Sequence, residues 1–335
     1  MYAPDPQRYD GRMPYPRCGE SGLKLPAISL GCWHNFGHID DQEEARAILR
    51  RAFDQGITHF DLANNYGPPP GSAEENVGRF LAEDFAAHRD ELIISTKSGY
   101  LMWDGPYGNW GSRKQMLSSL DQSLRRLRLD YVDIFYHHRP DPETPLEESM
   151  SALATAVQQG KSLYVGLSNY PYKQLKKAVR MLDAMGVPCL IYQPSYSILR
   201  RDPEPRIHPW LEANGIGSIP FSPLAQGMLT AKYLEGIPAG SRADREEGFV
   251  QKEQIDAQME TLRSLNQIAE GLGMPLHHLA LRWVMDQPAV TSALIGARTV
   301  AQLDDSLAAV EREPLDQQTL VAIDKVAPLQ KLSGA

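Results

Sequence analysis

Short apolar runs alternate with longer segments of helical period from about residue 28 to residue 310, without a linker-like gap. This alternation favours parallel strands joined by right-handed helical crossovers, with each strand buried on both faces. The predicted strands are Ile28–Leu30, Thr58–Asp61, Leu92–Thr96, Val132–Tyr136, Leu163–Leu167, Leu190–Gln193, Ser218–Phe221 and Ser292–Ile295. The predicted helices are Gln42–Gln55, Ser72–Glu83, Ser112–Leu127, Pro145–Gln159, Pro171–Met185, His208–Ala213, Glu253–Gly271, Pro275–Asp286 and Val300–Val310.

Eight such units of about 42 residues each match a (β/α)8 barrel, which has about 250 residues before insertions. Three segments accommodate the extra length: a predicted N-terminal hairpin over 13–26 that could plug the barrel bottom, a long insertion over 224–252 after the seventh strand, and a C-terminal helix over Pro314–Val326. A doubly wound sheet would need G-x-G-x-x-G after the first strand, and LGCWHNFGH lacks it. We therefore predict a single TIM-barrel domain over residues 1–335.

The charge balance is mildly acidic, with 34 Lys and Arg against 42 Asp and Glu, which argues against a general nucleic-acid or membrane surface. The spacing of Cys18, Cys32 and Cys189 supports neither a disulfide framework nor a CxxC metal site. No apolar run approaches the ~18 residues of a membrane span, and the N-terminus lacks a secretory pattern. We expect a soluble cytoplasmic protein without a bound metal, and the sequence leaves a homo-oligomer open.

Four kinds of reactive side chain follow neighbouring predicted strands. Asp61 and Tyr66 lie in HFDLANNYG after the second strand, Lys97 closes the third in ISTKSG, and His137 and His138 follow the fourth in FYHHRPD. Each residue alone has a structural explanation, such as a turn cap or a loop anchor. In a barrel, however, the carboxyl ends of the strands meet at one mouth, where catalytic groups lie. Their joint occurrence therefore predicts an active site.

This set of side chains suits protonation of a carbonyl oxygen that receives hydride. A free tyrosine has a pKa of ~10, and we expect the nearby Lys97 ammonium to lower the pKa of Tyr66 while Asp61 supports Lys97. A histidine near the substrate oxygen would stabilise the developing alkoxide. The sequence has no G-x-S-x-G motif, and adjacent histidines do not match a helical zinc site. These features favour reduction over hydrolysis.

Seven motifs carry a family resemblance: HFDLANNYG, ISTKSG, YVDIFYHHRPDPETP, YVGLSNY, YQPSYSILRR, PFSPLAQGMLTAKY and LIGARTVAQL. Together they resemble the aldo-keto reductases, in the bacterial branch that acts on L-glyceraldehyde 3-phosphate and is similar to the potassium-channel β-subunits. The resemblance implies NADPH-dependent reduction of small aldehydes, such as L-glyceraldehyde 3-phosphate or methylglyoxal-like compounds. It also implies a catalytic tetrad of Asp61, Tyr66 as general acid, Lys97 and His138, with no assigned role for His137.

The resemblance further implies how NADPH or NADP+ is held. Ser168, Asn169 and Gln193 match the residues that hold the nicotinamide carboxamide, and Phe221 matches the ring that stacks on the nicotinamide. The other cofactor positions implied are Trp33, Asp61, Ser222, Pro223, Leu224, Ala225, Gln226, Lys232, Arg242, Gly296, Ala297, Arg298, Gln302, Asp305 and Ser306. After the eighth strand the family often reads G-A-S-R, whereas this chain reads Gly296-Ala297-Arg298-Thr299. The arginine therefore stands one place earlier than in the family pattern. Candidates to line the mouth are Trp33, Tyr66, Trp103 and Trp110.

Two alternatives remain open from the sequence. The first is a channel-β-like subunit that binds NADP as a redox sensor and turns over weakly, although His138 at the tetrad position favours the reductase. The second is a metal-dependent barrel hydrolase that uses some of the nine histidines, although no H-x-H pair stands at a strand end.

Overall fold

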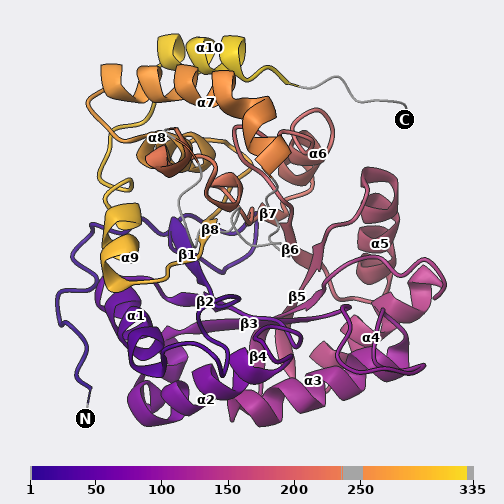
Figure 1. The fold of residues 1–335 in the computed structure, drawn as a ribbon. Coiled ribbons are helices and arrows are strands. Elements are labelled where there is room, and N and C mark those ends of the chain that lie inside the picture. Colours follow the sequence, from indigo (N-terminus) through magenta and orange to yellow (C-terminus); the bar gives the residue numbers. More distant parts are fainter. Residues whose placement is uncertain (1, 235, 237–251, 330–335) are drawn as a thin grey trace.

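The structure is a computed structural model that describes residues 2–234, 236 and 252–329. Its centre is a sheet of parallel strands in the order β7-β6-β5-β4-β3-β2-β1-β8 (Figure 1). Parallel bridges from Ser218 to Val290 and from Phe221 to Leu294 close this sheet, which confirms the predicted barrel. The strands are β1 (Ile28–Gly31), β2 (His59–Asp61), β3 (Ile93–Ser98), β4 (Val132–His137), β5 (Ser162–Ser168), β6 (Cys189–Gln193), β7 (Gly217–Ser218) and β8 (Ala293–Ile295).

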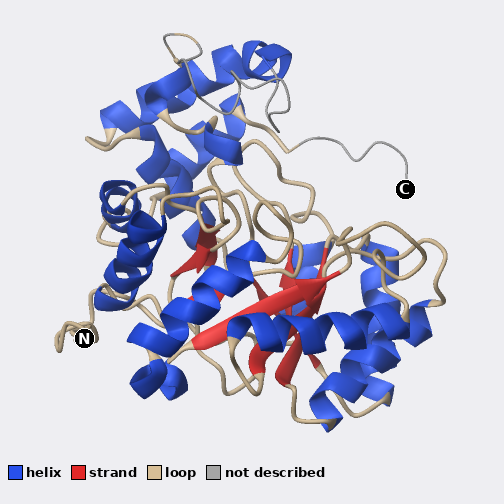
Figure 2. Cartoon of the chain, turned by 60° about the horizontal axis from the view of Figure 1, so that its bottom comes forward, coloured by secondary structure: helices blue, strands red, loops and turns tan. Residues whose placement is uncertain are grey.

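The helices form an outer layer around these strands (Figure 2). They are α1 (Gln42–Asp54), α2 (Ser72–Asp84), α3 (Arg113–Leu127), α4 (Leu146–Gln158), α5 (Tyr172–Ala184), α6 (Ile207–Ala213), α7 (Lys252–Gly271), α8 (Leu276–Met285), α9 (Val300–Leu307) and α10 (Gln317–Val326). Short 3-10 helices are η1 (Ala86–Glu91), η2 (Ala225–Gly227) and η3 (Ala231–Tyr233). Among the described residues, none of the helices combines the length and apolar character needed to cross a membrane.

Several elements differ from the sequence prediction: α9 ends three residues earlier than predicted, α10 begins three residues later, and two further differences have a clear physical reason. The seventh strand is shorter than predicted, because Pro220 has no N–H to donate to a neighbouring strand. Only isolated bonds continue the pairing beyond β7, such as the one from the Phe221 N–H to the Pro194 carbonyl at 2.9 Å. The 3-10 helix η1 was not predicted, because its six residues AAHRDE have no apolar period.

Helix α1 shows how the sequence positions the outer layer. The Asp41 carboxylate caps its N-terminus by accepting hydrogen bonds from the N–H groups of Glu43 and Glu44. Apolar residues then recur every three or four positions, so that one side of the helix faces the strands. The buried residues of α1 are Ala45, Ile48, Leu49, Ala52 and Phe53.

The N-terminal hairpin closes the bottom of the barrel, as predicted. Arg17 pairs with Lys24 in antiparallel fashion. Cys18 and Leu25 are fully buried, and they belong to the same apolar cluster as Ile134 of β4. The hairpin therefore completes the core inside the barrel.

The C-terminal helix is confirmed and extends a second apolar core outside the barrel. Ile323 of α10 is buried with Leu262 and Leu265 of α7, and Figure 1 shows the two helices side by side. The predicted insertion begins with η2 and η3, whereas residues 235 and 237–251 of it lie outside the described residues.

The barrel plug makes a test of stability possible. Leu25→Ala should lower the free energy of unfolding by about 2–5 kcal/mol, because it leaves a cavity in the interior. Leu272→Ala is the control, since Leu272 is 40% exposed, and it should cost less than about 1 kcal/mol. Urea unfolding measures both. Equal effects would show that the hairpin does not pack as a plug.

A buried histidine on α6 makes acid stability a second test. His208 packs edge-on against Tyr196 with ring centroids 4.7 Å apart, and its Nε2 has no hydrogen-bond partner among the described residues. Burial lowers the pKa of His208 from 6.5 to about 4. As the pH falls, the unfolded chain binds a proton at His208 before the folded protein does. The contribution of the neutral His208 to the free energy of unfolding is therefore fully present above pH 6.5 and is lost as the pH falls toward 4.

His208→Phe should remove this dependence. The ring shape is kept, so the variant should be close to the wild type in stability at pH 7. Between pH 6.5 and 4 it should lose less unfolding free energy than the wild type, by roughly 3 kcal/mol. Urea unfolding at pH 7, 6, 5 and 4 measures the difference. If the free energy of unfolding fell equally with pH in the two proteins, the lowered pKa of His208 would be contradicted.

Candidate active site

A buried ion pair joins two neighbouring strand ends. Asp61 ends β2, and Lys97 stands next to the end of β3, which pairs with β2 in parallel. The Lys97 ammonium donates to Asp61 Oδ2 and, at 2.6 Å, to the Leu62 carbonyl. Both side chains are almost completely buried, and burial lowers the pKa of Lys97. Lys97 is therefore held in one place by two oxygen acceptors.

Tyr66 lies over this ion pair. Its hydroxyl is 3.4 Å from Lys97 Nζ. Its carbonyl accepts hydrogen bonds from the N–H groups of Gly71 and Ala73, at 3.1 and 3.3 Å, which tie the loop after β2 to the start of α2. Burial of the hydroxyl, reinforced by the charge of Asp61, raises the pKa of Tyr66 well above 10. This differs from the sequence prediction that Lys97 lowers it, because burial penalises the phenolate and the Asp61 charge adds to that effect.

His138 completes the group of four. His138 directly follows β4, and its backbone N–H donates to the Ser98 carbonyl at 2.9 Å. Its ring meets the ring of Tyr66 edge to face, with centroids 5.9 Å apart and an interplanar angle of 72°. Burial first and the Lys97 charge second hold the pKa of His138 well below 6.5, so the imidazole is neutral. The structure thus brings all four predicted catalytic side chains together at one end of the barrel.

His137 points elsewhere and packs against other elements. Its Nδ1 is hydrogen-bonded to the Tyr170 hydroxyl. A Cβ atom at Gly111 would come within 2.2 Å of His137 Nε2, so the backbone there approaches the ring closely. His137 therefore packs behind the strand while His138 faces Tyr66.

Aromatic rings extend from the four residues along the rim. The Tyr100 ring lies 4.5 Å from the His138 ring, and the Arg139 guanidinium lies 4.1 Å from the Tyr100 ring and 3.7 Å from that of Trp110. On the other side, Trp33 is 5.9 Å from Tyr66. Trp103, another residue predicted to line the mouth, has a side chain that is 41% exposed. Tyr100 and Arg139 were missed in the sequence, although they follow the same strand ends as Lys97 and His138.

The residues predicted to hold the nicotinamide gather beside the ion pair. Ser168 ends β5, and its hydroxyl donates to the Gln193 carbonyl at the end of β6 at 2.8 Å. The Asn169 amide donates to the His138 carbonyl at 3.0 Å. The Gln193 amide donates to Asp61 Oδ1 at 3.3 Å. These amides and the hydroxyl match the hydrogen-bonding groups of a carboxamide.

The segment after β7 has a strained backbone. Phe221 pairs with both Ser195 and Leu294, which places it between β6 and β8. Seven non-glycine residues among those described have positive φ, and four of them are predicted cofactor positions: Asn169, Ser222, Ala225 and Gln226. Such strain clusters at ligand clamps, and successive N–H groups in turns form anion-binding concavities. The rest of this predicted set is Pro223 and Leu224, then Lys232, whose ammonium lies 4.7 Å from the Tyr233 ring, and Arg242, which lies outside the described residues.

The segment after β8 leads into the N-terminus of α9. Asn35 donates to the Ala297 carbonyl at 3.1 Å, and the Arg298 N–H donates to Gln302 Oε1 at 3.0 Å. The Arg298 side chain is exposed. A helix N-terminus favours phosphate groups. The structure thus places Gly296, Ala297 and Arg298 where a phosphate could be held.

The two remaining predicted nucleotide positions already have partners. The Ser306 hydroxyl donates to the Gln302 carbonyl of its own helix at 2.9 Å. The Asp305 carboxylate lies 2.8 Å from His277 Nε2 and 3.3 Å from His278 Nε2. Within the described part of the chain, these last three residues form the one group with metal-ligand spacing, and they lie on α8 and α9 rather than at a strand end.

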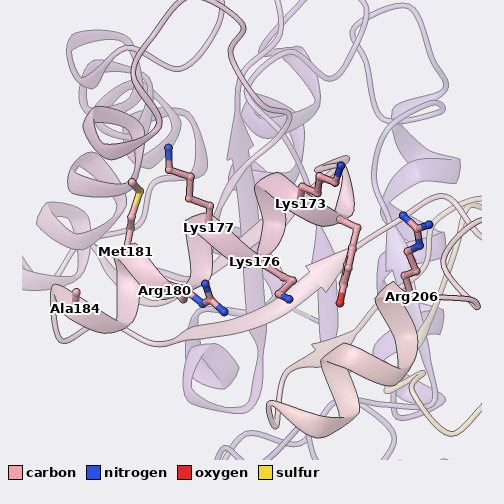
Figure 3. Close-up of a pocket in the computed structure, with 8 residues that line it drawn as sticks. Lys173, Lys176, Lys177, Arg180, Met181, Ala184 and Arg206 are labelled. Carbon is pink, nitrogen blue, oxygen red and sulfur yellow. The ribbon is translucent and has the colours of Figure 1, made fainter. Parts of the chain in front are cut away.

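A separate groove of about 560 Å³ lies along α5. Figure 3 shows basic side chains along this helix, with Arg206 beyond its Lys173 end. None of the four predicted catalytic residues lines it. Its lining residues are Tyr172, Lys173, Lys176, Lys177, Arg180, Met181, Ala184 and Arg206.

Known proteins are similar to this chain over almost its whole length. The model of the aldo/keto reductase family matches residues 27–328. L-glyceraldehyde 3-phosphate reductase of Escherichia coli (strain K12) is 54% identical over 330 residues, which cover 97% of this chain and 95% of that protein. A probable voltage-gated potassium channel subunit beta of Arabidopsis thaliana is 36% identical over 321 residues, which cover 94% of this chain and 95% of that one. The chain therefore belongs to the aldo/keto reductase family and is an oxidoreductase.

Proposed function

We propose that this protein uses NADPH to reduce small aldehydes to alcohols, with Tyr66 as the proton donor. The observation that carries the proposal is the convergence of the Tyr66 hydroxyl, the Lys97–Asp61 ion pair and the His138 ring at one end of the barrel. Aldehyde reduction needs a hydride at the carbonyl carbon and a proton at the oxygen. The reduced nicotinamide supplies the hydride when it is bound.

Tyr66 donates the proton, and Lys97 stabilises the phenolate that remains. Because its pKa is raised, Tyr66 carries its proton at neutral pH and can donate it to the carbonyl oxygen as negative charge develops there. The phenolate that remains lies 3.4 Å from the Lys97 ammonium, which stabilises it. Asp61 holds Lys97 in place through the ion pair.

His138 orients the substrate. Its ring is neutral, so it can donate one N–H to the carbonyl oxygen without competing with Tyr66 as the acid. The edge-to-face packing on both Tyr66 and Tyr100 fixes the plane of the imidazole. A preorganised donor of this kind stabilises the developing alkoxide at little cost in reorganisation.

The surroundings of the four residues fit a nicotinamide cofactor. Ser168, Asn169 and Gln193 offer groups for the carboxamide, and the strained turns of Ser222 and Gln226 offer N–H groups for phosphate. The exposed Arg298 at the start of α9 is suited to a 2′-phosphate, which supports NADPH over NADH. The family match over residues 27–328 supports our inference that residues 1–335 form one barrel domain.

The substrate class follows from the rim and from the relatives. Trp33, Tyr100 and Trp110 give the mouth aromatic walls, which suit a small aldehyde rather than a polymer. The relatives named as L-glyceraldehyde 3-phosphate reductases support that triose phosphate as substrate, with methylglyoxal as a second compound to test.

Tyr66→Phe should abolish most of the activity. Loss of the proton donor should lower kcat for aldehyde reduction by about 10²- to 10⁴-fold. The affinity for NADPH should change little, because the cofactor contacts proposed above remain. Loss of NADPH absorbance with L-glyceraldehyde 3-phosphate or methylglyoxal measures kcat, and fluorescence titration measures the affinity.

Tyr9→Phe provides a matched control for this variant. It removes a hydroxyl that is bonded to Glu91, a residue located before β3 at the other end of the barrel. Its kcat should equal that of the wild type. Near-normal turnover of Tyr66→Phe would refute the proton-donor role. Tight NADPH binding by the wild type without turnover of any aldehyde would instead favour the redox-sensor alternative.

Arg298→Gln should reduce the preference for NADPH. If the guanidinium pairs with the 2′-phosphate, its loss should raise KM for NADPH by about ten- to a hundredfold and leave KM for NADH unchanged. Arg263→Gln removes the same charge from the exposed face of α7 and serves as control. A parallel rise of both KM values in Arg298→Gln would contradict the assignment.

A further inference from the structure

A buried chain of hydroxyl groups and one imidazole leads from Asp61 across the inside of the barrel. The Ser95 hydroxyl donates to Asp61 Oδ1 at 2.6 Å. Ser95 is in turn 3.0 Å from His59 Nε2, and His59 Nδ1 is 2.9 Å from the Ser29 hydroxyl. Ser29 is bonded to the Ser292 hydroxyl at 2.6 Å. All five side chains are at most 1% exposed.

The hydrogen atoms in this chain can be ordered in one way only. Asp61 forms an ion pair with Lys97 and accepts from Ser95, so Ser95 uses its single proton on Asp61. Ser95 must then accept from His59, which places the imidazole proton on Nε2. Nδ1 therefore accepts from Ser29, and Ser29 accepts from Ser292. Every donor points toward the carboxylate.

The state of His59 is consistent with this order. The ring is fully buried, and burial lowers its pKa from 6.5 to about 4, while the two charged groups that face it, Asp61 and Lys97, act in opposite directions. A neutral imidazole has one donor and one acceptor nitrogen, which is what the chain requires. A protonated ring would need two acceptors and would disrupt the bond to Ser29.

This chain of hydrogen bonds leaves one oxygen of Asp61 free for Lys97. Ser95 and Gln193 donate to Oδ1, at 2.6 and 3.3 Å, whereas Lys97 donates to Oδ2. The carboxylate plane is thereby fixed, and the ammonium is held 3.4 Å from the Tyr66 hydroxyl. We propose that Ser95 and His59 are positioning residues that fix Asp61, and through it Lys97, in the geometry that Tyr66 needs to give up its proton. This inference rests on the proposed function.

A solely structural role would be satisfied by a simpler core. The rest of the barrel interior is largely apolar, with Ile134, Ile191 and Leu294 in one cluster, so polar side chains are not required to fill the space. Buried hydroxyls and imidazoles are costly unless each one is bonded. Here each bond leads toward the one carboxylate that pairs with Lys97, which points to positioning.

Ser95→Ala tests the proposal in the full-length protein. Loss of a hydrogen bond to a charged group should lower kcat for aldehyde reduction by about ten- to a hundredfold, with the NADPH dissociation constant unchanged. Ser218→Ala is the matched control. Ser218 is also a fully buried strand serine, but its hydroxyl has no hydrogen-bond partner among the described residues, so kcat should stay at the wild-type value.

Ser95→Thr separates positioning from folding. It keeps the hydroxyl and should restore kcat to within about threefold of the wild type. Urea unfolding of each variant confirms that folded protein is compared. A folded Ser95→Ala variant with wild-type kcat would overturn the proposal and leave the proposed function standing.

The proton order has a readout that does not depend on activity. Nitrogen-15 NMR of histidine at pH 7 should show a neutral His59 with the proton on Nε2. A proton on Nδ1, or a charged ring, would overturn the assigned order. If the wild-type protein reduces no aldehyde, the proposed function fails, and this measurement still tests the chain.

Discussion

The active end of this barrel depends on one buried ion pair, between Lys97 and Asp61. Removing an ammonium and a carboxylate from water costs several kcal/mol for each ion, roughly as much as their attraction returns. The pair persists because its other hydrogen-bonding positions are filled, by the Leu62 carbonyl on one side and by Ser95 and Gln193 on the other. The loss of one of these neighbours would leave a hydrogen-bonding position of a buried charged group unsatisfied, although the ion pair itself would remain.

The parallel sheet makes this arrangement possible. In β2, Asp61 is in register with Ser95 of β3, and Lys97 of β3 is in register with Tyr136 of β4. Alternate residues of a strand point to the same side, so His59 and Asp61 face the interior together with Ser95 and Lys97. The ion pair and the hydrogen-bonded chain beneath it are therefore consecutive layers inside one barrel.

The sequence predicts the barrel and its reactive end because both depend on local patterns. Strand periodicity and position in the chain suffice to place Asp61, Lys97 and the His137–His138 pair at adjacent strand ends, whereas the choice of His138 came from the family resemblance. The sequence does not reveal His59 as a partner of the site, because a histidine within an apolar run resembles an ordinary core residue. Nor does it give the pKa of Tyr66, which depends on how deeply the hydroxyl is buried and on how fully Asp61 compensates Lys97. Register and burial are properties of the assembled sheet.

The raised pKa of Tyr66 is consistent with proton donation when the whole site is considered. Asp61 and Lys97 form a neutral pair, and Tyr66 and His138 are both uncharged, so the uncharged aldehyde group of a substrate can approach them without a compensating ion. A lysine without a carboxylate partner would favour the phenolate and remove the proton before the substrate arrives. In the mechanism that we propose, burial and Asp61 keep the proton on Tyr66 until hydride transfer makes the substrate oxygen negative. The ammonium at 3.4 Å would then stabilise the new phenolate, so that the same ion pair would support the loss of the proton during the reaction.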